Sequence, residues 1–66
     1  MGYLSARRLD VVKDGVSHTA HARFNSAGKV ISTMCDAKNI TIKQFNSIGM
    51  YAVNTRQLRA FQPLLT

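Results

Sequence analysis

The dipeptide Asp14-Gly15 limits the fold of this 66-residue chain more than any other feature of its sequence. Asp-Gly between two apolar runs is a strong β-hairpin signal, because both turn positions tolerate positive φ angles. Beyond this turn, the residues from Val16 to Phe24 alternate between a mainly apolar set and a polar set. A period of two is typical of a strand with one face on a core. We therefore expect residues 3–24 to form a β-hairpin, with Val16 and Phe24 as its core anchors.

The two histidines lie three residues apart in the second strand of this hairpin. Because a strand points such residues to opposite faces, His18 and His21 cannot bind one metal ion together. Cys35 is the single cysteine, which excludes an intrachain disulfide and leaves no second thiol for a zinc site. We expect His18 to be half-buried, His21 to be exposed and Cys35 to be a small buried residue. The sequence predicts no metal site and no cofactor.

The catalytic inventory is small. The only carboxylates are Asp10, Asp14 and Asp36, and no two of them are placed for general acid–base chemistry. Cys35 has no histidine near it in the sequence, and only folding could bring His18 or His21 close to it. There is no glycine-rich phosphate loop. We therefore expect no enzymatic activity.

The stretch from residue 26 to residue 39 fits two interpretations. A helical stripe with apolar offsets of three, four and seven is formed by Ala27, Val30, Ile31 and Met34. Alternatively, Ser26-Ala27-Gly28 is a turn and Lys29 to Met34 is a third strand, which its β-branched residues favour. We prefer the helix because the spacing continues for two turns, and the strand remains the alternative.

Two further short helices are expected in the C-terminal half. Thr41 is a good N-cap for a helix that Gly49 would end. Asn54 would cap the last helix, from residue 55 to residue 62. Pro63 would end it, because the residue before a proline disfavours the helical conformation.

These three helices, with a glycine-containing turn between the last two, resemble the helix-turn-helix class of DNA-binding proteins. The resemblance is carried by Thr41-Ile42-Lys43-Gln44-Phe45, by Ile48-Gly49-Met50 and by Asn54-Thr55-Arg56-Gln57-Leu58-Arg59. It implies an α+β fold in one domain of residues 1–66, with an N-terminal β-hairpin followed by a three-helix, helix-turn-helix-like unit. It also implies that the last helix reads DNA.

The charge distribution points to a polyanionic partner. The formal net charge is +6, and residues 37–66 hold four basic residues and no acid. Such a segment favours nucleic acid through phosphate neutralisation and counterion release. The predicted nucleic-acid-binding residues are Lys38, Lys43, Gln44, Arg56, Gln57 and Arg59. We expect a small regulator of transcription that binds DNA, with RNA as the alternative nucleic acid.

A second hypothesis is a small inhibitor or adaptor that docks on an acidic surface of a larger enzyme or complex. Its motivation is the apolar load near the C-terminus, which a short chain buries with difficulty. The predicted partner interface consists of Met50, Tyr51, Phe61, Leu64 and Leu65.

Size and hydropathy set the remaining expectations. A chain this short usually needs a second subunit or a partner, so we expect a homodimer. No run of about 18 apolar residues is present, and MGYLSARR lacks the apolar core of a signal peptide. We therefore expect a cytoplasmic protein without membrane contact, of a size typical of small bacterial or phage factors.

Overall fold

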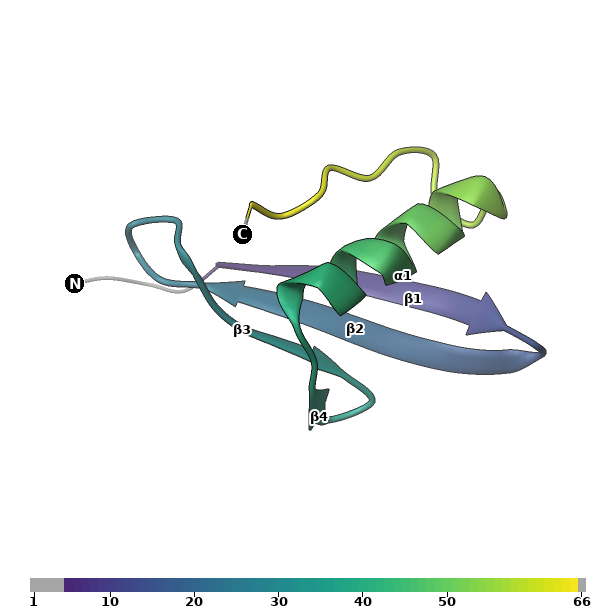
Figure 1. Cartoon of the computed structure of the whole chain (residues 1–66), viewed down its shortest axis with the longest axis horizontal. Helices are drawn as coiled ribbons and strands as arrows, with labels where there is room; N and C mark the ends of the chain where they lie inside the picture. Colours follow the sequence, from purple (N-terminus) through teal and green to yellow (C-terminus); the bar gives the residue numbers. More distant parts are fainter. Residues whose placement is uncertain (1–4, 66) are drawn as a thin grey trace.

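The computed structural model describes residues 5–65, which form a four-stranded antiparallel sheet and one helix. The elements in chain order are β1 (Ser5–Lys13), β2 (Val16–Phe24), β3 (Val30–Cys35), β4 (Lys38–Asn39) and α1 (Ile42–Asn54). The strands lie in the sheet in the order β1-β2-β3-β4. Figure 1 shows α1 lying across one face of the sheet, with the C-terminal tail running back along the helix.

Residues 5–24 form the expected hairpin. Asp14 and Gly15 have φ angles of 53° and 77°, which the two-residue turn requires. The predicted strand phase is also confirmed, since Ala20 and Ala22 on β2 are buried. Val16, however, is 55% exposed, so it does not anchor the core. The small alanines at the centre of β2 instead leave room for the helix.

The helix predicted for residues 26–39 is wrong, and the alternative third strand is observed. Gly28 has a φ of 77° and closes a turn in which its N–H donates to the Asn25 carbonyl at 2.9 Å. The Asn25 side chain accepts the N–H groups of Ala27 and Lys29, each at 3.0 Å. These bonds fold the chain back at residue 28, so the apolar residues that follow continue the sheet as β3.

The helix predicted to end at Gly49 continues through the expected connector as α1, to Asn54. Thr41 is its N-cap as expected, in a capping box with Gln44. Gly49 lies inside this helix and does not end it, and a Cβ at that position would lie closer than 3.0 Å to the Phe61 ring. Glycine at this position therefore serves a close approach of the tail to the helix.

The helix ends after Asn54 in a Schellman motif. Arg56 adopts a φ of 62°, its N–H donates to the Val53 carbonyl at 3.0 Å, and Gln57 N–H donates to the Ala52 carbonyl at 2.8 Å. Beyond this cap, the described chain up to residue 65 is a tail without regular secondary structure. The predicted helix at residues 55–62 is therefore wrong, and so is the three-helix, helix-turn-helix-like unit.

Two carboxamide side chains hold the tail in place. The Gln57 amide donates to the Val12 carbonyl at 2.8 Å and accepts the Val12 N–H, in the manner of a neighbouring strand. Asn46 on α1 donates to the Leu64 carbonyl at 2.9 Å and accepts its N–H at 2.8 Å. The tail thereby closes the core between α1 and the sheet. The buried core residues are Leu9, Val11, Ala20, Ala22, Phe45, Ala52 and Leu64.

The backbone of the turn between β3 and β4 is strained at a non-glycine residue, and a substitution by glycine can relieve this strain. Asp36 and Ala37 form it with φ angles of 52° and 66°, and alanine pays a steric cost in this region. We expect Ala37→Gly to raise the free energy of unfolding by about 0.5–1 kcal/mol, because the relieved strain exceeds the added entropy of the unfolded chain. Urea unfolding followed by circular dichroism measures this. Ala27→Gly is the control and is expected to lower stability, since Ala27 has no positive φ.

Candidate functional site

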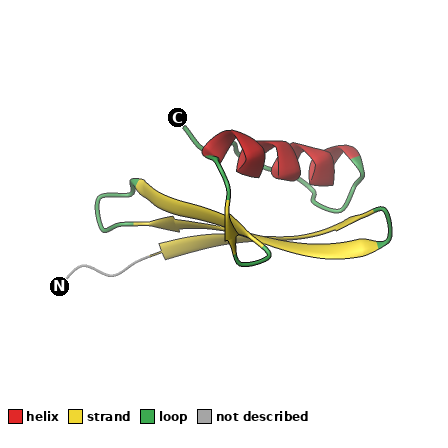
Figure 2. Cartoon of the chain, turned by 60° about the horizontal axis from the view of Figure 1, so that its bottom comes forward, coloured by secondary structure: helices red, strands yellow, loops and turns green. Residues whose placement is uncertain are grey.

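One face of the sheet is not covered by the helix or by the tail in the described part of the chain (Figure 2). Side chains alternate between the two faces of a strand, so this face carries the neighbours of the buried residues. The uncovered face consists of Ala6, Arg8, Asp10, Val12, Ser17, Thr19, His21, Arg23, Ser32 and Met34. It is mostly polar, which a solvated or ligand-binding sheet face requires.

The single carboxylate among these ten residues, that of Asp10, interacts with two neighbouring side chains. Arg8 Nε lies 3.3 Å from Asp10 Oδ2, and the Thr19 hydroxyl donates to Asp10 Oδ1 at 3.0 Å. Arg23 is exposed and His21 half-buried. A shallow hollow of about 370 Å³ is lined by Ala6, His21, Arg23, Met34 and Ala37. The uncovered face thus offers positive charge and hydrogen-bond donors, with its one acid paired internally.

The residues predicted to bind nucleic acid do not share one helix face. They form two groups, Lys38, Lys43 and Gln44 near the start of α1, and Arg56, Gln57 and Arg59 after its end. A helix of 13 residues is about 20 Å long, so the structure separates these groups instead of bringing them together. Their role in binding stays a prediction.

The two glutamines of this predicted set are engaged within the fold. Gln44 Oε1 accepts the Thr41 N–H at 2.9 Å in the capping box, and the Gln57 carboxamide is bonded to Val12. Reading a base edge would break these bonds. Lys38, Lys43, Arg56 and Arg59 are all exposed.

The residues predicted to form a partner interface are also divided. Leu64 is only 8% exposed, and the Phe61 ring packs 5.9 Å from the Phe45 ring, centroid to centroid. Met50 and Leu65 are exposed, at 42% and 91%. The fold therefore buries some of the C-terminal apolar side chains that motivated the hypothesis of a protein-binding inhibitor or adaptor. Docking through Met50 and Leu65 stays a prediction.

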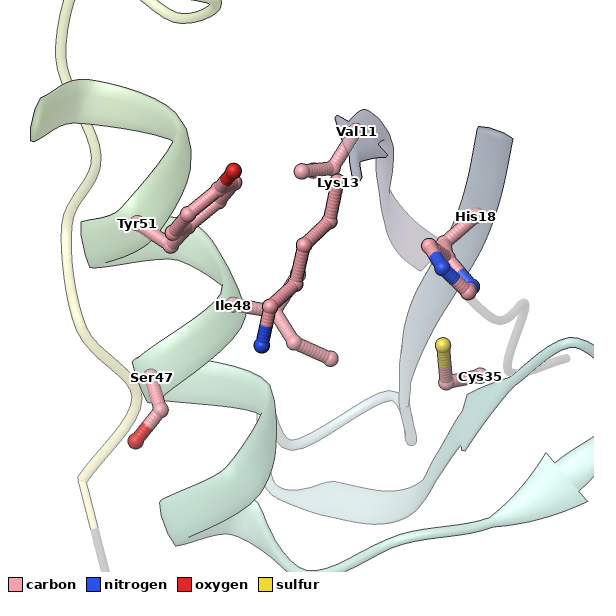
Figure 3. Close-up of a pocket in the computed structure, with 7 residues that line it drawn as sticks. All are labelled: Val11, Lys13, His18, Cys35, Ser47, Ile48 and Tyr51. Atoms are coloured by element: carbon pink, nitrogen blue, oxygen red, sulfur yellow. The ribbon is translucent and has the colours of Figure 1, made fainter. Parts of the chain in front are cut away.

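A pocket of about 290 Å³ lies on the helix side of the sheet (Figure 3). Its lining residues are Val11, Lys13, His18, Cys35, Ser47, Ile48 and Tyr51. Lys13 Nζ lies 5.7 Å from the centroid of the Tyr51 ring, so its ammonium group faces an aromatic wall. His18 and Cys35 share the opposite wall, on β2 and β3 (Figure 3).

His18, Cys35 and Asp36 form a cluster beside this pocket. Their nearest ligand atoms all lie within 4.8 Å of one another. Asp36 Oδ2 is 2.7 Å from His18 Nδ1 and accepts from Cys35 Sγ at 3.8 Å. Asp36 Oδ1 accepts the Thr19 N–H at 3.1 Å, and the Asp36 N–H donates to the Thr19 carbonyl at 2.9 Å. The carboxylate is thus fixed to β2 by main-chain bonds.

These contacts shift the pKa values of two groups in the cluster, the Asp36 carboxyl and the Cys35 thiol. The hydrogen bond from His18, then that from Thr19, lowers the pKa of the Asp36 carboxyl. Burial, and secondly the charge of Asp36, raises the pKa of the Cys35 thiol. The free thiol is therefore protonated at neutral pH and is not an activated nucleophile.

The sequence did not predict this cluster because it assigned β3 to a helix. The pairing of Ala20 with Cys35 across β2 and β3 places His18, two residues along the same face, diagonally beside the thiol. The sequence already predicted which face of the strand His18 lies on. The alternative assignment of residues 29–34 as a strand would therefore have been enough to predict that His18 and Cys35 are neighbours.

No protein-family model matches the chain, and no similar chain is found among curated proteins or among solved structures. No helix in residues 5–65 is long and apolar enough to cross a membrane.

Proposed function

We propose that this protein binds nucleic acid through the uncovered face of its sheet. The observation that carries the proposal is the pairing of Asp10 with Arg8 and Thr19, which leaves no free carboxylate beside Arg23 among the ten described residues of that face. With a chain charge of +6, such a face attracts phosphate and gains from counterion release.

The dimensions of the hairpin favour duplex DNA over duplex RNA. β1 and β2 are nine residues each, so their ribbon is about 30 Å long. The major groove of B-DNA, about 12 Å wide, admits a two-stranded β-ribbon. The major groove of A-form RNA is deep and too narrow for side chains to read.

The side chains of this face divide into two roles. Arg23 is a long cation that contacts phosphate or guanine edges. Arg8, whose charge Asp10 partly offsets, adds a phosphate contact. His21, which lies opposite Arg8 in the register, and the hydroxyl of Ser17, further along β2 towards the hairpin turn, are donors or acceptors for base edges. A protein of this kind acts by occupying its DNA site, which is how a small transcription regulator works.

Paired charge removals test the proposal. We expect Arg8→Gln/Arg23→Gln to weaken binding of a fluorescently labelled DNA duplex about tenfold or more at moderate salt, measured by fluorescence anisotropy. Two lost phosphate contacts also reduce the slope of log K against log salt by about 2. The matched control is Arg56→Gln/Arg59→Gln, which removes the same charge from the tail.

The control variant distinguishes the loss of a specific binding site from the loss of net positive charge. The proposal predicts that the tail variant binds within about threefold of the parent protein, as expected for screened charges off the interface. Equal losses in both variants would show that net charge alone governs binding. A larger loss in the tail variant would move the interface to the segment after α1.

A further inference from the structure

We propose that His18, Cys35 and Asp36 form a binding site for a zinc ion on the helix side of the sheet. The three residues offer an imidazole nitrogen, a thiol sulfur and a carboxylate oxygen within 4.8 Å of one another. The site lies on the opposite face from Arg8 and Arg23, so it is independent of the proposed nucleic-acid binding.

The separations are close to those of a tetrahedral zinc site. Zinc binds these ligand types at about 2.0–2.3 Å, which places ligand atoms about 3.3–3.8 Å apart. Cys35 Sγ and Asp36 Oδ2 are already 3.8 Å apart, and His18 Nδ1 and Asp36 Oδ2 are 2.7 Å apart. Opening the His18–Asp36 hydrogen bond by about 0.7 Å admits the ion, by the same bond lengths.

The ligand positions are held by the backbone. Cys35 is the last residue of β3, and its partner in the register is Ala20 on β2. Asp36 is joined to Thr19 by two hydrogen bonds, one through its main-chain N–H and one through its carboxylate. The loss of side-chain freedom on binding is therefore small at Asp36, and the backbone that carries Cys35 is already fixed in the sheet.

The donor set selects the metal. A thiolate with an imidazole prefers zinc over magnesium and calcium, which take oxygen ligands. Three protein ligands leave a fourth position for water or for another ligand atom. His18 and Cys35 also line the neighbouring pocket, so that position is accessible from solvent.

Zinc at this point would fasten β2 to β3 in a domain without a disulfide. A ligand that binds only the folded state raises the free energy of unfolding by RT ln(1 + [L]/Kd). Small domains commonly need such a supplement. The site is therefore expected to raise the melting temperature when zinc is added.

Cobalt(II) titration of the reduced protein tests the site, because cobalt reports thiolate coordination by a charge-transfer band in the near ultraviolet. We expect this band at one equivalent, displaced by zinc. We expect Cys35→Ser to abolish it, and His18→Gln and Asp36→Asn each to weaken zinc binding at least about tenfold. The matched control is His21→Gln on the other face, which is expected to bind as the parent protein does.

Two results would overturn the proposal. One is a parent protein that shows no thiolate band with cobalt. The other is a band whose strength is unchanged by both His18→Gln and Asp36→Asn, which indicates adventitious binding to a single thiol. Zinc-dependent melting in the parent but not in Cys35→Ser, with equal far-ultraviolet circular dichroism, separates lost binding from lost folding.

Discussion

Replacing Phe45 with alanine is expected to remove most of the stability of this protein. Phe45 is fully buried at the centre of the contact between α1 and the sheet. Truncating a buried phenylalanine costs about 3–5 kcal/mol through lost burial and a residual cavity. A domain of 66 residues has a stability of roughly 3–10 kcal/mol, at about 0.05–0.15 kcal/mol per residue. Thermal or urea unfolding followed by circular dichroism measures the loss.

Two companion variants calibrate this result. Phe45→Leu keeps most of the volume and is expected to lose less than about half as much as the alanine variant, in line with the small cost of hydrophobic swaps. Met50→Ala lies on the exposed side of α1 and is expected to change stability by less than about 0.5 kcal/mol. If Phe45→Ala were no more costly than Met50→Ala, α1 would not pack as described.

Gly49→Ala is expected to destabilise the parent protein and to stabilise the Phe61→Ala variant. In the parent, the new methyl group overlaps the Phe61 ring, which also contacts the Phe45 ring and the Arg7 guanidinium. Overpacking of this kind costs about 1–3 kcal/mol. Without the ring, the substitution gains the helix propensity of alanine, about 1 kcal/mol over glycine.

The comparison is a double-mutant cycle, measured by urea unfolding of the four proteins. The account predicts a coupling free energy of about 2–4 kcal/mol between residues 49 and 61, the sum of the two opposite effects. A Gly49→Ala substitution that stabilises both backgrounds equally would show that the tail does not pack on the helix. It would then leave Gly49 as an ordinary glycine in a helix interior.

The hairpin and the helix N-cap could be predicted because short-range chemistry decides them. Asp14-Gly15 and Thr41 act through their own backbone and that of residues a few positions away. Gly49 is different, since a glycine at that position is compatible with a helix end and with a helix interior. The ring of Phe61, twelve residues further on, decides between them, and no local pattern shows that contact.

The third strand shows a second limit. The spacing of Val30, Ile31 and Met34 matches a helix. Val30 and Ile31 are also β-branched, which favours a strand. The turn that precedes them, with Gly28 in the left-handed region, settles the choice. Once β3 is a strand, its register with β2 brings His18, Cys35 and Asp36 together, so one wrong assignment hid the whole cluster.

The sequence placed the candidate nucleic-acid interface in the C-terminal half of the chain for an electrostatic reason, whereas our proposal places it on the sheet. Residues 37–66 contain no acid, so their charge stands out in the sequence. The N-terminal half contains all three aspartates and looks nearly neutral. In the structure Asp10 contacts Arg8 and Asp36 is hydrogen-bonded to His18, so both carboxylates are engaged within the sheet.

Methyl NMR of [13C-methyl]methionine-labelled protein, titrated with a DNA duplex, tests the central claim most directly. Met34 lies on the uncovered face beside His21 and Arg23, whereas Met50 is exposed on α1. The account predicts that the Met34 methyl resonance shifts on binding and that the Met50 resonance does not. A shift of Met50 with Met34 unchanged would place the nucleic acid on the helix and contradict the proposed sheet interface.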